Sequence, residues 1–447
     1  MLAIQRIMKL AKSTCILLFV FITANLFSQV PSPGIKQSKS IMLKGATIHV
    51  GDGKVLANGA IAFEDGKITL VLSEDDLKKV KLKKYDTIID VSGKHIYPSF
   101  IAANSTLGIG EVESVKATLD FAEIGTYNPH VRALIAFNTD SKVASTVRTN
   151  GVLYIQVTPR DGVISGKSSV VSLDAWNWED AVLRTDDGIH VNFPNMIQRH
   201  GWWAEPEPSS NNSKYDEQIN ELKKFFTEAK YYCDAADKQE TNLRFEAMRP
   251  IFTGKASVYI HADYVKDIIA AVNFSKAFGL KKTVIVGGKD SWKVTSLLKQ
   301  NNIAVMVNRL HDLPGAEQED IDQAFKLPYL LQKDSVLFCL QNQGDMEGMN
   351  TRNLPFLAGT ACAYGLTQEQ AVASITLNAA KILGVDDKIG SLEVGKNASI
   401  IVSNGDALDM RTNNIVLAFV EGRVVVLHNS QIDLYNKYMN KYNLPNK

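Results

Sequence analysis

Apolar residues recur along this chain with two different periods. Between residues 41 and 72 they alternate with polar residues on both sides of a Gly-Asp-Gly turn and an Asp-Gly turn, and similar strand-like runs return at 390–402 and around the pair Glu421-Gly422. Alternation with a period of two predicts half-buried strands, and the glycine-containing turns predict hairpins. We therefore expect a β-rich unit at each end of the chain, and we expect the two to combine into one small, discontinuous β-sandwich.

The long middle of the chain alternates short apolar runs with amphipathic stretches. Apolar residues three and four positions apart predict helices. The candidate helices are 215–234, 264–278 and 291–300. The candidate strands are 151–157, 257–261, 283–286, 303–307 and 336–340. Strands that alternate with helices over such a length favour a parallel sheet and an α/β fold class, and the segment 204–213 between two of these elements is expected to be a polar loop.

The first 29 residues have the order of a secretory signal. The basic residues Arg6, Lys9 and Lys12 precede an apolar run from Cys15 to Phe27. This run is short for a membrane span, and the basic-then-apolar order is typical of a cleaved signal peptide. We expect an exported protein, periplasmic or secreted, with no membrane span after signal cleavage; an uncleaved anchor is the alternative.

The charge balance argues against partners that require a strong electrostatic field. The chain has 49 basic and 48 acidic residues, and the basic residues are scattered. Neither nucleic acid nor an anionic membrane is therefore an expected partner. Four cysteines are present, one of them Cys15 in the leader. The other three form no disulfide or zinc pattern, and we interpret them as small buried hydrophobes.

Residues 91–110 are the stretch around which the chain is organised. Pro98 precedes a short apolar strand, which ends in the polar triplet Asn104-Ser105-Thr106 and is followed by glycines. Because side chains alternate along a strand, Asn104 and Thr106 are expected to point the same way. Two metal ligands at the end of a barrel strand need that geometry. An amide and a hydroxyl, however, are weak ligands for a catalytic divalent ion.

The same stretch resembles the start of the catalytic barrel in the amidohydrolase superfamily, especially its imidazolonepropionase-like branch. That pattern runs Pro-Gly-hydrophobic-Ile-Asp-x-His-x-His-x-Gly. Here Pro98 and Gly108 match, while Asn104 and Thr106 stand on the two histidine positions. The segment GSLEVGKNASIIV at 390–402 also resembles the closing segment of the family.

The resemblance extends over about residues 41–427 and implies an architecture for the whole chain. The implied fold is a (β/α)8 TIM-type barrel with a small β-sandwich formed by both chain ends. Its expected parts are a signal peptide at 1–29, sandwich strands at 30–92 and 388–430, the barrel at 93–387 and a tail at 431–447. Active sites of such barrels lie at the carboxyl ends of the strands.

The resemblance also implies where the remaining metal ligands would lie. His261, at the end of a predicted strand, is the only ligand position that keeps its residue, whereas Gly287 and the amide residues around Asn342 occupy the others. The pocket is therefore expected at Asn104, Thr106, His261, Gly287 and Asn342, and no metal or other cofactor is predicted. Asp345 is a weak candidate for a catalytic acid or base, with Glu347 nearby. His190 and His130 are candidate replacement ligands.

Two further segments carry candidate chemistry. Residues 161–169 are rich in glycine and serine, but their spacing does not match a phosphate-binding loop, and we interpret them as a loop beside the pocket. Trp176 and Trp178, with Trp202-Trp203, place aromatic side chains in loops after early strands. These aromatics either line a ligand pocket or pack an insertion.

Intact members of the superfamily hydrolyse non-peptide carbon-nitrogen bonds, typically in cyclic amides, with a bound divalent metal. Because most ligand positions are changed here, we expect a non-catalytic protein that binds a small molecule or acts as a partner subunit. The expected assembly is a homodimer, or a heterodimer with an intact paralogue. The alternative is an active hydrolase with a rearranged site at His261, Asp345 and His190, holding zinc or a similar divalent metal.

Overall fold

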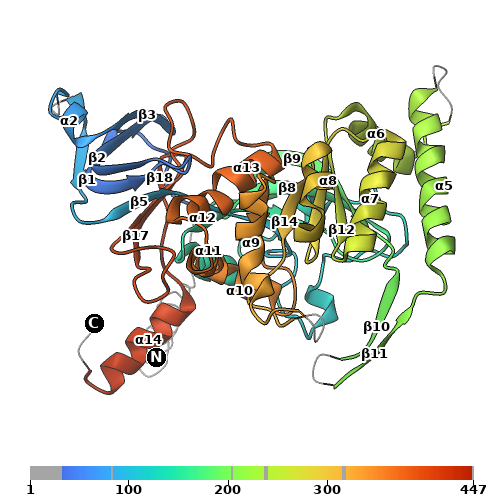
Figure 1. The fold of residues 1–447 in the computed structure, drawn as a ribbon. Coiled ribbons are helices and arrows are strands. Elements are labelled where there is room, and N and C mark those ends of the chain that lie inside the picture. Colours follow the sequence, from blue (N-terminus) through green and yellow to red (C-terminus); the bar gives the residue numbers. More distant parts are fainter. Residues whose placement is uncertain (1–32, 82–83, 203–204, 236–239, 315–318, 445–447) are drawn as a thin grey trace, which may run out of the picture. The chain divides into compact units, whose positions relative to one another are not determined.

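The computed structural model describes residues 33–81, 84–202, 205–235, 240–314 and 319–444, and Gly34–Lys447 form one unit of it (Figure 1). The predicted signal peptide, with Cys15, lies outside the described residues. None of the described helices is long and apolar enough to cross a membrane.

Eight strands of the middle segment form a nearly closed barrel. In sheet order they are β6 (Phe100–Ser105), β7 (Val152–Val157), β8 (Ile164–Ser172), β9 (Val182–Asn192), β12 (Ser257–Ala262), β13 (Thr283–Gly287), β14 (Ala304–Val307) and β15 (Phe338–Leu340). An isolated parallel bridge between Ala103 and Gln341 joins the first strand region to the last. The α/β fold class and the TIM-type barrel are therefore confirmed.

One strand of this barrel runs against the others. β8 pairs antiparallel with both β7 and β9, whereas the remaining neighbours in the barrel pair in parallel. The expectation of a loop over 161–169 is wrong from Ile164 onward. Its glycines and serines suggest a loop, but Ile164, Val170 and Val171 are fully buried between two neighbouring strands, and burial decides the conformation.

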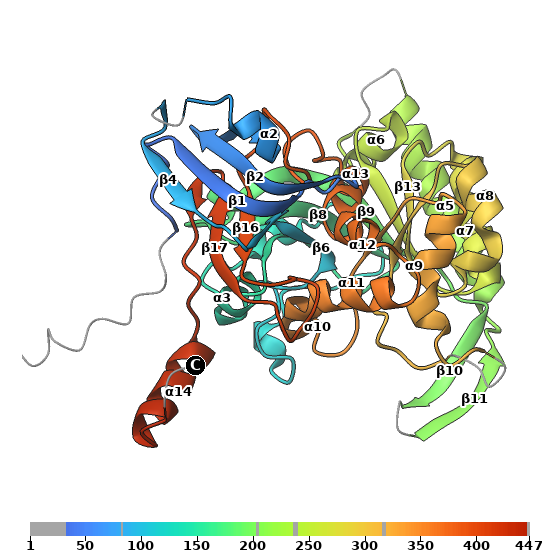
Figure 2. The ribbon, with the colours of Figure 1, turned by 60° about the vertical axis from the view of Figure 1, so that its left-hand side comes forward.

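Helices surround the barrel strands (Figure 2). They include α3 (Lys142–Arg148), α5 (Tyr215–Asp234), α6 (Leu243–Thr253), α7 (Val265–Phe278), α8 (Thr295–Gln300), α9 (Gln323–Lys333), α11 (Leu354–Ala363), α12 (Gln368–Ser374) and α13 (Leu377–Leu383). The predicted helix at 215–234 is confirmed by α5, and that at 264–278 by α7 within one residue. The stretch 291–300 divides into a 3-10 turn, Ser291–Val294, and α8.

A hairpin extends from the barrel between β9 and α5. It consists of β10 (Ile197–Trp202) and β11 (Glu205–Asn211), which pair antiparallel. The polar loop expected at 204–213 is thus wrong for most of its length. The two strands pair through backbone hydrogen bonds and do not need a buried apolar face. The segment therefore shows no alternation of apolar and polar residues that would predict a strand.

Strands from both chain ends share a second sheet of eight strands. Its order is β18 (Arg423–Val424), β17 (Ile415–Val420), β16 (Ile400–Ser403), β5 (His95–Pro98), β1 (Ile41–His49), β2 (Val55–Glu64) and β3 (Lys67–Leu72), with β4 (Thr87–Asp90) also on β1. Hydrogen bonding is continuous, because β5 pairs with β1 on one side and β16 on the other. We call this element the two-ended sheet.

The two-ended sheet positions the first barrel strand. Its core includes Phe63 and Phe419, whose ring centroids lie 4.9 Å apart although the residues come from opposite chain ends. β5 ends at Pro98, and β6 begins at Phe100. The backbone N–H of Ser99 between them donates to the carbonyl of Ser399, 3.0 Å away. The start of β6 is therefore fixed by a segment three hundred residues away in sequence.

Candidate functional site

The polar triplet at the end of β6 reaches the carboxyl ends of β7 and β15. Asn104 is fully buried and has a left-handed backbone with φ of 52°. The pairing of β6 with β7 is irregular between Ala102 and Ser105, so the simple alternation expected for this strand end does not hold. The Asn104 amide nitrogen donates to Oε1 of Gln343 at 2.9 Å, leaving its oxygen to face another partner.

That partner is Arg160, which follows β7. Its guanidinium donates to the side-chain oxygen and to the backbone oxygen of Asn104, each at 2.8 Å. It also donates to Oε1 of Glu347 at 2.8 Å, and the same carboxylate oxygen accepts the backbone N–H of Thr106 at 2.7 Å. The side chains of Arg160 and Glu347 are only 13% and 9% exposed. This buried ion pair joins the ends of β6 and β7 to α10 (Glu347–Asn350).

A cavity of about 620 Å³ opens beside this ion pair. Thr106, Arg160 and Glu347 form part of its wall, together with apolar residues from the loop after β6, from α3 and from the start of α10. The apolar contributors are Val112, Leu119, Phe121, Val143, Met346 and Met349. A concave, largely apolar site with a few fixed polar groups is typical of small-molecule pockets, so we call this cavity the mouth pocket.

Two histidines lie side by side on β9 and β12. Nδ1 of His190 lies 3.0 Å from Nε2 of His261, and the ring of His190 also stacks on Tyr259 with centroids 4.6 Å apart. Nε2 of His190 is buried and has no hydrogen-bond partner. A buried unpaired N–H is costlier than an unpaired lone pair, so we assign the proton to Nδ1 of His190, which donates to His261.

Both imidazoles are neutral at physiological pH. Burial, and then the adjacent His261, lowers the pKa of His190 well below its usual value. The His261 side chain is partly exposed, but most of the water around it is replaced by protein. This desolvation, and then the positive charge of Arg160, lowers the pKa of His261 to about 3. Desolvation and a nearby cation both disfavour the imidazolium form.

A buried polar network connects Asn104 to the wall of the barrel. The backbone N–H of Asn104 donates to Gln156 at 3.0 Å, and the Gln156 amide donates to Asp187 at 2.8 Å. The Tyr259 hydroxyl donates to the same Asp187 oxygen at 2.5 Å. Burial raises the pKa of Asp187. Three barrel strands, β7, β9 and β12, are thus joined to the site through one carboxyl group.

The other predicted pocket residues do not share this arrangement. Gly287 ends β13 with φ of 98°, and a Cβ there would collide with the Asp263 carboxylate. The Asn342 amide donates to the carbonyl of Asn350 at 2.8 Å and so holds the following loop. Asp345 is exposed and lines the mouth pocket. His130 is exposed on a loop, and among the described residues no three His, Cys, Asp or Glu side chains are grouped to hold a metal.

Comparisons with known proteins identify relatives of this chain. The sequence profile of the "Amidohydrolase family" matches residues 297–425. Imidazolonepropionase from Symbiobacterium thermophilum is 21% identical over 402 residues, which cover 78% of this chain and 85% of that protein. Imidazolonepropionase from Pseudomonas entomophila is 24% identical over 378 residues, covering 80% and 90%. The chain is an imidazolonepropionase-like member of the amidohydrolase superfamily.

The fold of this amidohydrolase-superfamily chain is also that of solved structures. The crystal structure of an amidohydrolase from Thermotoga maritima MSB8 matches with a TM-score of 0.73 at 24% identity. The match covers 86% of this chain and 99% of that one. The shared barrel therefore extends well beyond the segment that the sequence profile matches.

The divalent metal of intact superfamily members does not fit the residues present here. A catalytic zinc normally takes three protein ligands and keeps one open position. The oxygen of Asn104 is already bonded to the Arg160 guanidinium, and Gly287 has no side chain. The facing nitrogens of His190 and His261 are bonded to each other. A second cation beside Arg160 would also be repelled.

The residues that the sequence did not reveal are those whose hydrogen bonds hold the polar groups of the site in place. Gln156, Arg160, Asp187 and Tyr259 were not singled out, and Glu347 was only mentioned beside Asp345. One signal was available for Arg160, since it comes just after a predicted strand, where barrel sites lie. Asp187 and Gln156 carry no such signal, because a polar residue within a strand is ordinarily taken to face solvent.

Proposed function

We propose that this superfamily member is a non-hydrolytic barrel that binds a small molecule in the mouth pocket without a metal. The observation that carries the proposal is the Arg160 guanidinium, bonded to Asn104 and Glu347 where a metal centre would need free ligands. Arginine keeps its charge at every physiological pH, so this cation is permanent. The mouth pocket beside it supplies the space and the apolar surface for a ligand.

Metal content tests the first half of this proposal. The purified protein is incubated separately with zinc, manganese and iron, dialysed, and measured by elemental analysis beside carbonic anhydrase treated in the same way. We expect less than about 0.1 ion per chain, because the described residues offer no closed ligand set. About one tightly held ion per chain would overturn the proposal and indicate a hydrolase.

Ligand binding tests the second half. A library of small cyclic amides and their hydrolysis products is screened by thermal shift, and any hit is measured by calorimetry. The double substitution Asn104→His and Thr106→His removes the side-chain oxygen that accepts from Arg160 and places a larger side chain at residue 106 in the pocket wall, so a hit that binds the mouth pocket should lose at least about tenfold in affinity. Unchanged binding by this variant would exclude the mouth pocket.

The His190–His261 pair favours one rival function, an active amidohydrolase with a rearranged site. Two neutral imidazoles side by side are suitable metal ligands, although Asp345 does not complete a group of three with them. The rival predicts that His261→Ala abolishes both metal content and turnover while the fold is retained. A protein without measurable turnover of cyclic amides before the substitution would exclude it.

Assembly and location are part of the proposal. The family resemblance supports a homodimer or a heterodimer with an intact paralogue, and the basic-then-apolar order of residues 1–29 supports export to the periplasm or medium. Light scattering of the purified protein tests the first point. Cell fractionation of the full-length chain, with mass spectrometry of its N-terminus, tests the second.

A further inference from the structure

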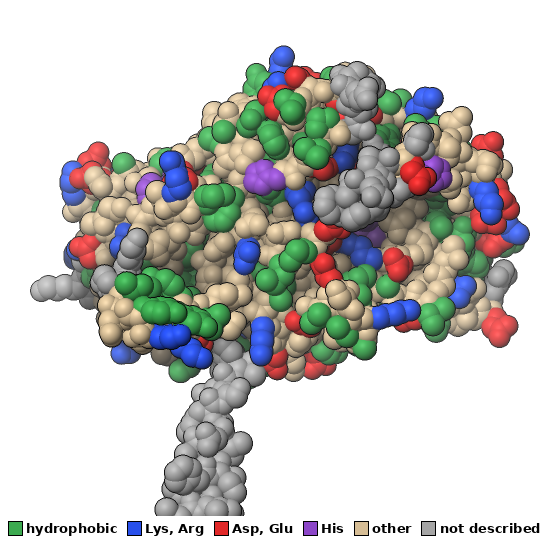
Figure 3. All heavy atoms as spheres, turned by 90° about the horizontal axis from the view of Figure 1, so that it is seen from below, with side chains coloured by type: hydrophobic (Ala, Val, Ile, Leu, Met, Phe, Trp, Pro, Cys, Tyr) green, Lys and Arg blue, Asp and Glu red, His purple; other side chains and the backbone are tan. Residues whose placement is uncertain are grey.

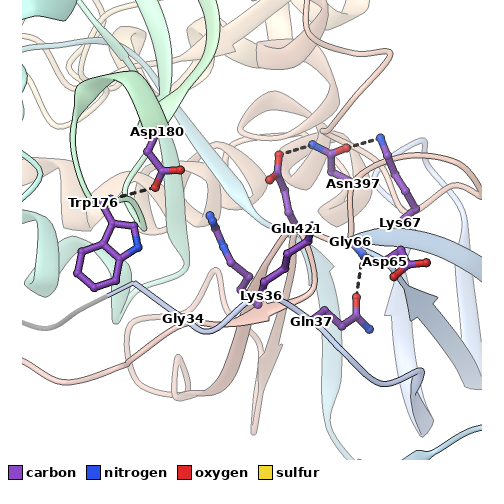
Figure 4. Close-up of a pocket in the computed structure, with 11 residues that line it drawn as sticks. Gly34, Lys36, Gln37, Asp65, Gly66, Lys67, Trp176, Asp180, Asn397 and Glu421 are labelled. Carbon is purple, nitrogen blue, oxygen red and sulfur yellow. Dashed lines mark hydrogen bonds between the residues drawn. The ribbon is translucent and has the colours of Figure 1, made fainter.

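A second cavity, of about 410 Å³, lies away from the barrel mouth (Figure 4). One wall is the two-ended sheet with the segment that leads into it, and the other is the loop after β8. Its lining residues are Gly34, Lys36, Gln37, Asp65, Gly66, Lys67, Trp176, Asp180, Asn397, Glu421 and Arg423. We call it the sheet-side pocket, and nothing in the proposed barrel function uses it.

Trp176 is the exposed aromatic at the edge of this pocket. Its residue is 66% exposed, and its indole makes no hydrogen bond or ring contact with a described residue. Its backbone, by contrast, is held on both sides. The N–H donates to Asp180 at 3.0 Å, and the carbonyl accepts from Thr139 at 3.1 Å. A large ring held on a fixed loop without a partner offers binding area at little cost in conformational entropy.

The opposite wall is a row of fixed polar groups, as Figure 4 shows. The Lys67 ammonium donates to Asn397 at 2.6 Å, and the Asn397 amide donates in turn to Glu421 at 2.9 Å. Below them the Gln37 side chain accepts the N–H of Gly66 at 2.9 Å. These bonds orient each group while leaving further N–H donors on Lys67 and a second oxygen on Glu421. The wall therefore presents both hydrogen-bond donors and hydrogen-bond acceptors to a ligand, already held in fixed orientations.

The charges of the sheet-side pocket cancel. Lys36, Lys67 and Arg423 are basic, and Asp65, Asp180 and Glu421 are acidic, so three positive and three negative side chains give a formal net charge of zero. An ionic ligand would meet attraction and repulsion together. A neutral ligand rich in groups that both donate and accept matches the wall better.

We propose that the sheet-side pocket binds a neutral polyhydroxylated ring compound, the chemistry of a saccharide unit, stacked on Trp176. The C–H face of such a ring is apolar and flat enough to cover the indole, and its hydroxyls donate and accept at the rim. The polar wall of Lys67, Asn397 and Glu421 is suited to those hydroxyls. This site is separate from the mouth pocket, so either proposal can fail without the other.

The test uses the full chain and defined probes. Cellobiose, maltose and N,N'-diacetylchitobiose are titrated by calorimetry and by tryptophan fluorescence, beside glycylglycine and inorganic phosphate as charged probes. We expect at least one disaccharide to bind at concentrations below about 10 mM, with Trp176→Ala weakening it at least about tenfold. Tyr231→Ala, another exposed aromatic at 72%, is the matched control and should change affinity less than about twofold.

Lys36→Met separates a neutral ligand from an ionic one, because it changes the charge of the pocket but leaves the indole in place. We expect it to change disaccharide affinity less than about threefold. No binding of any disaccharide at about 10 mM would overturn the proposal, as would binding unaffected by Trp176→Ala. Preferential binding of phosphate or glycylglycine that is lost in Lys36→Met would overturn it too.

Discussion

The guanidinium of Arg160 contacts Asn104 at two points, the side-chain oxygen and the backbone oxygen, each at 2.8 Å. This contact places a built-in cation at the mouth of the barrel. Because the guanidinium of arginine stays charged and planar, the positive charge beside Asn104 is permanent and no ion from solution is needed to supply it. Seen from below, the surface shows acidic, basic and histidine side chains interspersed with apolar ones (Figure 3).

Removing Arg160 should destabilise the protein strongly. Arg160→Met leaves the Glu347 carboxylate buried without its cation, and loss of one partner of a buried pair typically costs about 3–5 kcal/mol in free energy of unfolding. Urea denaturation measures this loss. The double variant Arg160→Met, Glu347→Gln should recover part of it, because no unpaired charge then remains.

Arg411→Met is the matched control for that substitution. Arg411 pairs with Asp409 at 2.7 Å, but its side chain is 84% exposed, so no measurable change is expected. Equal effects of the substitutions at Arg160 and Arg411 would contradict the view that the mouth depends on a buried cation.

Stability should fall as the pH is lowered below the ordinary histidine range. The pKa values of His190 and His261 are lowered in the folded chain, that of His261 to about 3, so the unfolded chain binds protons first as the pH falls. Their contribution to stability is complete above about pH 6.5 and is lost as the pH falls below that value, for His261 down to about 3, at up to about 1.4 kcal/mol per pH unit for each histidine.

Urea denaturation at several values between pH 8 and pH 5 measures this slope in the wild type and in His261→Gln. The variant should show a shallower slope, because one of the two depressed groups is gone. Asp187, whose pKa is raised, acts in the opposite sense, and its contribution is lost as the pH rises through its folded value. Identical slopes in the two proteins would show that His261 titrates normally.

Gly287 should tolerate a side chain poorly. Gly287→Ala places a Cβ against the Asp263 carboxylate at a φ of 98°, and we expect a loss of about 1–3 kcal/mol in free energy of unfolding. Gly279→Ala is the control, since φ is also positive there, at 65°, but no atom lies within 4 Å of the added Cβ. The loss at Gly279 should therefore be smaller when both are measured by thermal denaturation. A larger loss at Gly279 would contradict the collision at Gly287.

The hydroxyl of Tyr259 should contribute to the stability of the fold. Tyr259→Phe removes a 2.5 Å donor from the buried Asp187 carboxyl and should lower the free energy of unfolding by about 1–3 kcal/mol, with a further rise in the pKa of Asp187. Denaturation at pH 7 checks the loss. Tyr231→Phe, at a residue 72% exposed, should be neutral, and a neutral Tyr259→Phe would show that Asp187 is satisfied without this bond.

The sequence by itself determined the class of fold. The frame around Pro98 and Gly108, the apolar run ending at His261 and the closing segment at 390–402 are local patterns, and local patterns depend on period and turn chemistry that a single chain displays. The alternation of strands and helices predicted the α/β class, and the strand-like runs at both ends predicted that they contribute to one β-rich unit, whereas the barrel was implied by the resemblance that these segments carry.

Only the tertiary structure decided what those polar residues do. Arg160, Asn104 and Glu347 are far apart in sequence, and their ion pair and hydrogen bonds exist because three separate elements meet at one barrel end. The reversal of β8 and the pairing at 205–211 were decided in the same way, by neighbouring strands rather than by composition. Long-range contacts of this kind leave no period in the sequence, so the residues that complete the site became visible only when the chain was folded.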